Sequence, residues 1–316
     1  MSTEILLLIF LILLTFPFIP GIIEFIRKKD IQPLNINLEQ YKDPAFFGKQ
    51  YKNFLENLIG NLKKPDKKIY QISPNTLKIE ISKEKFEIIK IYENSLATDQ
   101  PENQAEEIII AKGENVQTQT PIKTNKEITI QGNLSVNHPI ETKALLVEGN
   151  ININSNLKIN YWIHVEGKGQ INNTSILGIN AFFKELYILS SCLFKRIFAN
   201  KIIVGKSSNQ NESLNKSNIS IFKGTIKAKK DITIKTQDKK LIIEGDLISD
   251  KSIIVEGDVW IKGNIFSHTG IVILNGATVG EENKIKSVIA KKRILLINHC
   301  KIYGYLHTEG IGIVQI

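Results

Sequence analysis

The stretch KLIIEGDLISDKSIIVEGDVWIKGN, residues 240–264, contains one seven-residue pattern twice. Each copy of this pattern is called a phrase below. LIIEGDL begins at Leu241, and IIVEGDV begins 12 residues later at Ile253. Related phrases occur elsewhere in the chain as ITIQGNL from Ile128, LLVEGNI from Leu145, IHVEGKG from Ile163 and VILNGAT from Val272. The steps between neighbouring phrases are 12, 17, 18 and 19 residues, all close to multiples of six. A repeat of this kind indicates an architecture built from short, similar units.

The phrases alternate with a period of two, which is typical of a strand with one dry face and one wet face. Ile253, Val255 and Val259 fall on one side, and Glu256 and Asp258 fall on the other. Glycines recur on the inward side, where a bend or the close approach of a neighbouring backbone requires them. Three faces of about six residues make one turn of about 18 residues, so equivalent phrases stack at about 4.8 Å.

The pattern therefore predicts an all-β fold, a three-sided parallel β-helix over residues 106–316 with about eleven turns before loops are subtracted. All nine prolines lie at or before Pro139, which fits near-continuous sheet after that point. A propeller would repeat every 40 to 50 residues, and a leucine-rich repeat would need a helix in each unit. A β-sandwich would favour turn prolines and longer strands.

Residues 1–26 are predicted to be a retained transmembrane helix. The chain is almost wholly apolar from Ile5 to Ile23, which is long enough to span a hydrocarbon core of about 30 Å. Glu4 precedes this run, and Arg27, Lys28 and Lys29 follow it, the reverse of a cleaved signal peptide. The positive flank is expected to stay on the cytoplasmic side, which places residues 27–316 inside the cell. Pro17 and Pro20 leave a kinked, shallow or re-entrant segment as the alternative.

Residues 27–105 are predicted to form a short α/β juxtamembrane region. Asp43 and Pro44 are typical of a helix start, and apolar residues at helical spacing follow as far as Leu62. This amphipathic helix packs on its own domain or, as the alternative, lies on the membrane or binds a partner. Residues 69–93 alternate like two or three strands, and residues 94–107 are a polar linker.

The formal charge of +9 permits an anionic partner or only a solvated lysine surface. The stretch from Lys206 to Lys240 carries nine lysines against three acidic residues. Residues 205–220, which overlap it, are expected to be a protruding loop. A lysine-rich edge discourages unwanted strand pairing, and binding to anionic lipid is the other interpretation. No nucleic acid is expected as a partner, because the stretch has no arginine and only Phe222 as an aromatic residue.

No catalytic activity, cofactor or metal is predicted. An outward acidic row could serve polysaccharide chemistry, although each member is also simply the outward residue of its phrase: Glu148, Glu166, Glu244 and Glu256. Alternation places His164, His299 and His307 outside and Cys300 inside. Trp162 and Trp260 also point outward, where they are candidates for lateral contact with another protein or for packing against a loop.

The glycine-punctuated phrases resemble those of the bactofilins, which are polymer-forming bacterial cytoskeletal proteins. The similarity is best over residues 225–316 and fainter over residues 106–205. The predicted anchor followed by YKDPAFFGKQYKNFLENLI, residues 41–59, resembles the larger membrane-anchored proteins of this type. The resemblance implies a right-handed three-sided β-helix, self-assembly through the helix ends, and neither nucleotide binding nor catalysis. The chain departs from a typical bactofilin in its longer sheet and its added helical region.

The chain stops with GIGIVQI, residues 310–316, which is apolar and uncharged. A last coil exposes backbone donors and acceptors, so this end is predicted to pair with another subunit through Ile311, Ile313, Val314 and Ile316. At the other end, the predicted amphipathic helix is a ready cover.

These observations predict a membrane-tethered, self-associating scaffold. Its expected partners are other copies of the chain, the membrane, and envelope or morphogenesis proteins. The rival hypothesis is a membrane-anchored β-helix that binds or cleaves envelope polysaccharide.

Overall fold

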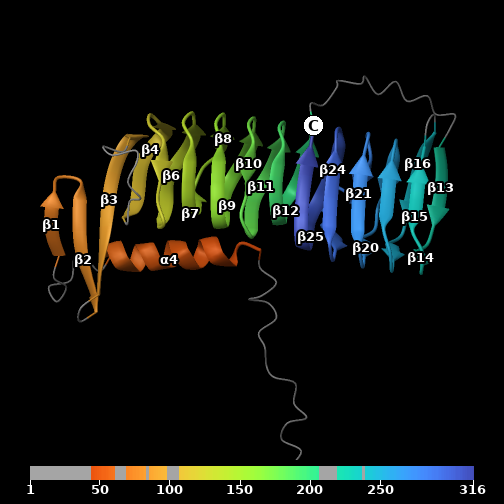
Figure 1. The fold of residues 1–316 in the computed structure, drawn as a ribbon, viewed down its shortest axis with the longest axis horizontal. Coiled ribbons are helices and arrows are strands. Elements are labelled where there is room, and N and C mark those ends of the chain that lie inside the picture. Colours follow the sequence, from red (N-terminus) through yellow and green to blue (C-terminus); the bar gives the residue numbers. More distant parts are fainter. Residues whose placement is uncertain (1–43, 61–68, 83–84, 98–106, 206–218, 237–238) are drawn as a thin grey trace, which may run out of the picture. The chain divides into compact units, whose positions relative to one another are not determined.

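The computed structural model describes residues 44–60, 69–82, 85–97, 107–205, 219–236 and 239–316, and these residues are almost all β. One helix, α4 (Phe46–Gly60), precedes three strands, β1 (Ile69–Ser73), β2 (Thr76–Ser82) and β3 (Lys85–Leu96). The compact unit that contains them spans Pro44–Ile316 (Figure 1). The predicted helix and strands thus belong to the same unit as the coils. The predicted anchor, residues 1–26, lies outside the described residues.

The coils fall into two segments. The first coil segment, residues 108–204, contains β4 (Ile108–Thr118), β5 (Ile122–Lys123), β6 (Glu127–Val136), β7 (Ile140–Val147), β8 (Ile151–Ile153), β9 (Leu157–Ile171), β10 (Ser175–Ile176), β11 (Asn180–Ile188) and β12 (Cys192–Val204). The second coil segment, residues 219–315, contains β13 (Ile219–Lys223), β14 (Ile226–Ala228), β15 (Ile232–Lys235), β16 (Lys240–Glu244), β17 (Leu247–Ser249), β18 (Ile253–Glu256), β19 (Val259–Ile261), β20 (Ile265–Ser267), β21 (Gly270–Leu274), β22 (Thr278–Val279), β23 (Lys286–Ala290), β24 (Arg293–Ile297) and β25 (Cys300–Gln315). Together they make a solenoid of about 11 turns.

Three strands make one turn of the second segment. Strands β16, β17 and β18 pair in parallel with β19, β20 and β21, in that order. Leu241 lies beside Val259 and Ile253 lies beside Ile271, which are 18-residue steps. The 12-residue step in the opening quotation therefore joins two different faces of one turn. The six-residue grid and the parallel coil predicted from the sequence are confirmed.

The two segments meet in a way that the sequence did not indicate. Strand β12, the last of the first segment, pairs antiparallel with β25, the last of the second. All other pairings between strands of the coil segments are parallel in the part of the chain that the structure describes. Figure 1 shows the C-terminus beside β12, with β13 at the far end of the coil. The second segment thus starts far from where the first ends, and winds back to meet it.

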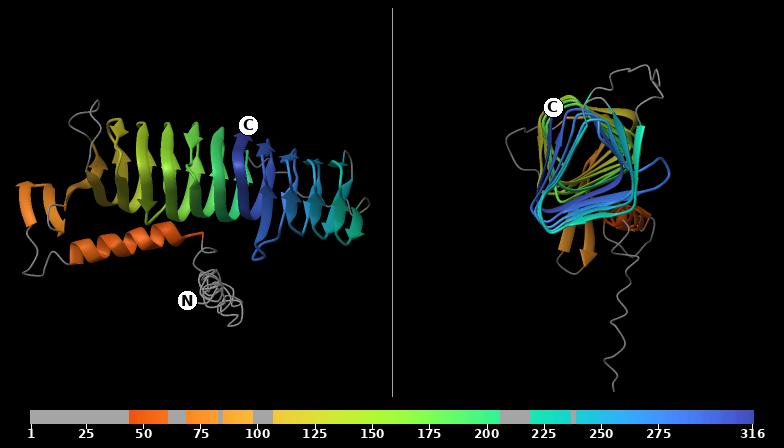
Figure 2. Two further views of the ribbon diagram at one scale, coloured as in Figure 1. Left: turned by 60° about the horizontal axis from the view of Figure 1, so that its bottom comes forward. Right: turned by 90° about the vertical axis from the view of Figure 1, so that its right-hand side faces the viewer.

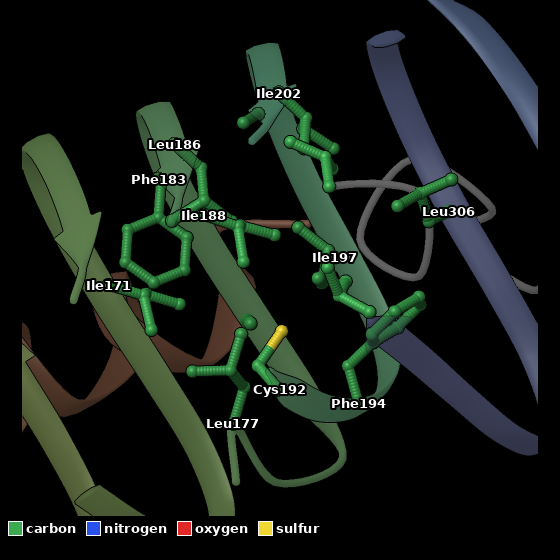
Figure 3. Packing of buried hydrophobic residues seen from close by; sticks show 14 of the residues in the cluster. Ile171, Leu177, Phe183, Leu186, Ile188, Cys192, Phe194, Ile197, Ile202 and Leu306 are labelled. Atoms are coloured by element: carbon green, nitrogen blue, oxygen red, sulfur yellow. The ribbon is translucent and has the colours of Figure 1, made fainter. Parts of the chain in front are cut away.

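The alternating residues fill the interior of the coil. Ile253, Val255, Val259 and Ile261 have no exposed surface, whereas Ile254 on the opposite face is half-buried. Figure 3 shows the same interior near the meeting of the segments, where Phe183, Leu186 and other side chains converge. The predicted inward register is confirmed.

Buried hydroxyl groups hold several corners of the coil. Ser249 Oγ donates a hydrogen bond to Lys230 O at 2.8 Å and accepts one from Lys251 N at 2.9 Å. Ser267 Oγ donates to Lys251 O one turn later. Each hydroxyl satisfies a backbone carbonyl of the preceding turn and a backbone amide of its own turn, where the ladder is interrupted.

Glycines stack where successive turns approach most closely. A Cβ atom on Gly149 would lie 2.7 Å from Gly132 O, and one on Gly167 would lie 2.6 Å from Gly149 O. Real Cβ contacts are not this short. These glycines therefore make room for a neighbouring backbone, as the phrases predicted.

Helix α4 lies along the outside of the coil (Figures 1 and 2). Leu55 and Leu58 are buried in a cluster with Ile79, Ile89 and Ile110. The helix therefore packs on its own domain, the first of the two alternatives. It does not cap the end of the coil, because β3 pairs with β4, β2 with β3, and β1 with β2. Strands β1 to β3 extend that end of the coil. The prediction that the amphipathic helix covers it is therefore wrong.

Within the described residues, no helix is long and apolar enough to span a membrane.

The register gives a direct stability test. Val255→Asp would bury an unpaired carboxylate and should lower the free energy of unfolding by at least about 3 kcal/mol. Ile254→Asp places the same charge on the outer face and should cost about 1 kcal/mol. Thermal unfolding of the two variants measures the difference. Equal losses would show that the register is wrong.

Candidate interaction surfaces

Two carboxylates of the predicted acidic row bind helix α4. The Nζ atom of Lys52 lies 3.2 Å from Glu148 and 3.0 Å from Glu166. These two glutamates belong to neighbouring turns, so one lysine of the helix forms ion pairs with both turns. Glu148 and Glu166 therefore hold α4 on the coil, and this use of the two residues was not anticipated.

The other two members of the row are also neutralised. Glu244 pairs with Lys262 at 2.9 Å, and Glu256 pairs with Lys235 at 2.8 Å. The hydrogen bond from each lysine holds the pKa of its glutamate below the usual range. Such carboxylates stay ionised near neutral pH, whereas a general acid needs a raised pKa.

Both tryptophans have partners within the chain. The ring of Trp162 contacts Tyr51 of α4 edge-on, with centroids 5.4 Å apart. Trp260 Nε1 donates a hydrogen bond to Gly280 O at 2.8 Å, and Lys262 Nζ lies 5.0 Å from the ring centroid. Packing against another part of the same chain, the alternative to lateral contact, accounts for both residues.

The histidines occupy different surroundings. His164 points outward as predicted, but the nearby helix α4 leaves it only 5% exposed, and it stacks on Phe182 at 4.6 Å. His307 accepts a hydrogen bond from Arg196 Nε at 3.0 Å. Burial and then the Arg196 charge lower the pKa of His307. In the described part of the chain, no group of three or more His, Cys, Asp or Glu side chains could hold a metal ion.

The C-terminal residues chosen for self-association lie where the two segments meet. Ile313 and Val314 sit between β24 and β12, opposite Leu193 and Cys192 of β12. The expectation of an open edge here is wrong for these two residues, because an earlier strand of the same chain covers it. Ile311 and Ile316 are 43% and 50% exposed.

The junction of β12 with β25 buries two free cysteines. Cys192 and Cys300 are buried and free, and burial raises the pKa of each thiol to about 12. Cys300 therefore faces inward as predicted. Thiols with so high a pKa are unreactive at neutral pH.

Strand β1 forms an open edge at one end of the sheet. Among the described strands it pairs only with β2. Its sequence, IYQIS, carries no charged side chain, and Ile72 is 58% exposed. Natural edge strands usually carry charge, proline or a bulge that discourages pairing with another chain. β1 has neither charge nor proline, although its pairing with β2 shifts in register between Gln71 and Ser73.

A second open edge lies at the other end. Strands β13, β14 and β15, here called the terminal coil (residues 219–235), pair on one side with β16, β17 and β18. No described strand pairs with their other side. Ile219, Ile221 and Phe222 are 45%, 56% and 44% exposed. Sequence reasoning assigned the open end to the C-terminus and overlooked this one.

The junction can be tested by a disulfide. Leu193→Cys together with Ile313→Cys places two thiols at directly opposed antiparallel positions, about 4.5–5.5 Å apart at Cα, which suits a disulfide. Mild oxidation should join them within one chain, giving a monomeric band of altered mobility on a non-reducing gel. Leu193→Cys with Ile221→Cys is the matched control and should not cross-link. A covalent dimer of the first variant would show that β25 pairs between chains.

No protein-family model, curated protein or solved structure matches the chain. The resemblance to bactofilins therefore depends on the repeated phrases and on the predicted anchor followed by residues 41–59. The surfaces described above are the basis for the functional proposal.

Proposed function

We propose that the chain is a membrane-tethered scaffold of the bactofilin-like type, which self-associates and positions partner proteins at the bacterial inner membrane. One observation carries the proposal: a long coil ends on one side in an open strand edge that carries no charged side chain. A surface of this kind suits protein association better than chemistry. The right-handed winding implied by the resemblance is part of the proposal.

Self-association is assigned to β1 in place of the C-terminal residues. Two copies of β1 can pair edge to edge in antiparallel fashion, extending the sheet across two chains. The contact is isologous, because the same strand contributes from both sides. The exposed side chain of Ile72 would then pack against the second chain.

The polysaccharide hypothesis receives less support. Hydrolysis of a glycosidic bond needs a carboxylic acid that is protonated near neutral pH. The described glutamates with a shifted pKa all have it lowered, and lysines cause this: Glu141, Glu185, Glu244, Glu256 and Glu281. These five carboxylates are therefore poor candidates for a general acid.

Tethering is assigned to residues 1–26, with the coil in the cytoplasm. The apolar run is long enough to span the membrane, and the three basic residues directly after it favour the cytoplasmic side.

The β1 edge gives a test of self-association. Ile72→Lys adds a charge to the open edge and should convert the full-length chain, in detergent, from dimer to monomer by mass photometry. Ile179→Lys replaces a comparably apolar, 37% exposed residue away from β1 and should leave the dimer intact. A wild-type chain that is already monomeric, or an unchanged Ile72→Lys dimer, would refute the assignment.

The topology has its own test. A C-terminal tag on the full-length chain should be protected from protease in intact spheroplasts and cleaved after lysis. Cleavage in intact spheroplasts would place the coil outside the cytoplasm and favour the polysaccharide hypothesis.

A further inference from the structure

The terminal coil is the one turn whose interior reaches an open end in the described chain. Phe222 lies opposite Ile243 in the ladder, so it occupies an inward position. Ile243 has no exposed surface, whereas Phe222 is 44% exposed. The difference arises because no further turn lies over Phe222 among the described residues. Ile226, Ala228 and Ile234 are likewise only partly buried against the core.

Charge is concentrated on this same turn. Residues 219–236 hold five lysines and a single acid, Asp231, for a net charge of +4. Residues 239–258, the next turn, hold three lysines and five carboxylates, for a net charge of −2. The terminal coil thus differs from the next turn in the sign of its charge. Residues 283–308 also carry six basic residues and no acid, but strands β23 and β24 there are paired on both sides, so that charge does not border an open end.

The lysines surround the open end. Lys223 closes β13, Lys227 lies in β14, Lys229 and Lys230 form the next corner, and Lys235 closes β15. Lys235 pairs with Glu256 of the next turn. Lys227, Lys229 and Lys230 make no ion pair with any described residue. A ring of cations thus encloses an apolar centre.

A second copy of the chain that presents its own terminal coil is a poor occupant for this end. An isologous contact would bring two +4 rings against each other, and like charges at a desolvated contact are strongly unfavourable. The β1 edge has no such obstacle. An occupant of the terminal coil must be anionic, and it must accept exposed isoleucine and phenylalanine side chains.

We propose that the terminal coil is a membrane-contact surface that binds anionic lipid, with the lysine ring on the headgroups and Ile219, Ile221 and Phe222 at the boundary of the acyl region. An anionic bilayer offers both features, negative charge at the surface and apolar chains beneath it. This contact is separate from the predicted anchor and adds a second attachment to the same membrane. It goes beyond the proposed scaffold function and does not depend on pairing of β1.

A fluorescent probe at the terminal coil tests the proposal in the full-length chain. Ser220→Cys, at an exposed inward position, carries a polarity-sensitive label, while the buried Cys192 and Cys300 stay unlabelled. The chain is reconstituted in vesicles of phosphatidylcholine alone or with about one third phosphatidylglycerol. The predicted anchor is the same in both kinds of vesicle, so any tethering through it is constant. We expect the emission of the label to shift to the blue and to be quenched by brominated lipid only in the anionic vesicles. Both effects should be lost at high salt.

Charge reversal supplies the matched comparison. Lys227→Glu, Lys229→Glu and Lys230→Glu together should abolish the shift. Three exposed lysines elsewhere on the coil, changed as Lys195→Glu, Lys291→Glu and Lys292→Glu, should leave it unchanged. If the two triple variants lose the emission shift equally, the chain is drawn to the anionic vesicles by its overall charge, and the proposal is overturned.

Two further results would also overturn it. No shift in either vesicle would exclude lipid contact. A shift that is equal in both vesicles and grows with the ratio of protein to lipid would identify a second copy as the occupant. Neither result alters the dimer measured by mass photometry, so this proposal and the assignment of β1 fail independently.

Discussion

Backbone hydrogen bonding requires every strand of a coil to have a neighbour on both sides, and the ends of the coil are where this requirement is hardest to meet. The chain has two coil segments and therefore four ends. The pairing of β12 with β25 closes two of them against each other. Strands β1 to β3 extend the third end, and the fourth, the terminal coil, has no described cover. This single antiparallel contact joins the two segments into one solenoid.

The repeat phrases were sufficient to predict the coil but not its direction. Alternation at Ile253 and Val255 indicates which side chains point inward. The 18-residue step indicates which residues of successive turns lie beside each other. Both properties are local. A second segment that continues the first and one that returns from the far end have the same alternation and the same step. The choice between them depends on where the chain runs between Val204 and Ile219, and residues 205–220 looked like a simple protruding loop.

Outward residues were harder to interpret than inward ones for a related reason. A strand pattern shows that the side chains of Glu148, Trp162 and His164 point away from the core, but it does not show which residues they contact outside it. Helix α4 approaches all three from a distant part of the sequence, through Lys52, Tyr51 and Gly48. The amphipathic face of α4 was visible in the sequence, whereas the partner of that face was not. The corner hydroxyl groups of Ser249 and Ser267 were missed because serine on an inward position carries no distinctive spacing.

The two open edges differ in charge, and this difference limits how the chain can assemble. β1 is uncharged and suited to pairing with itself, while the terminal coil carries five lysines and repels its own kind. Growth into a filament needs both ends of the coil to bind other copies. A chain that pairs only through β1 closes as an isologous dimer with a lysine ring at each outer end.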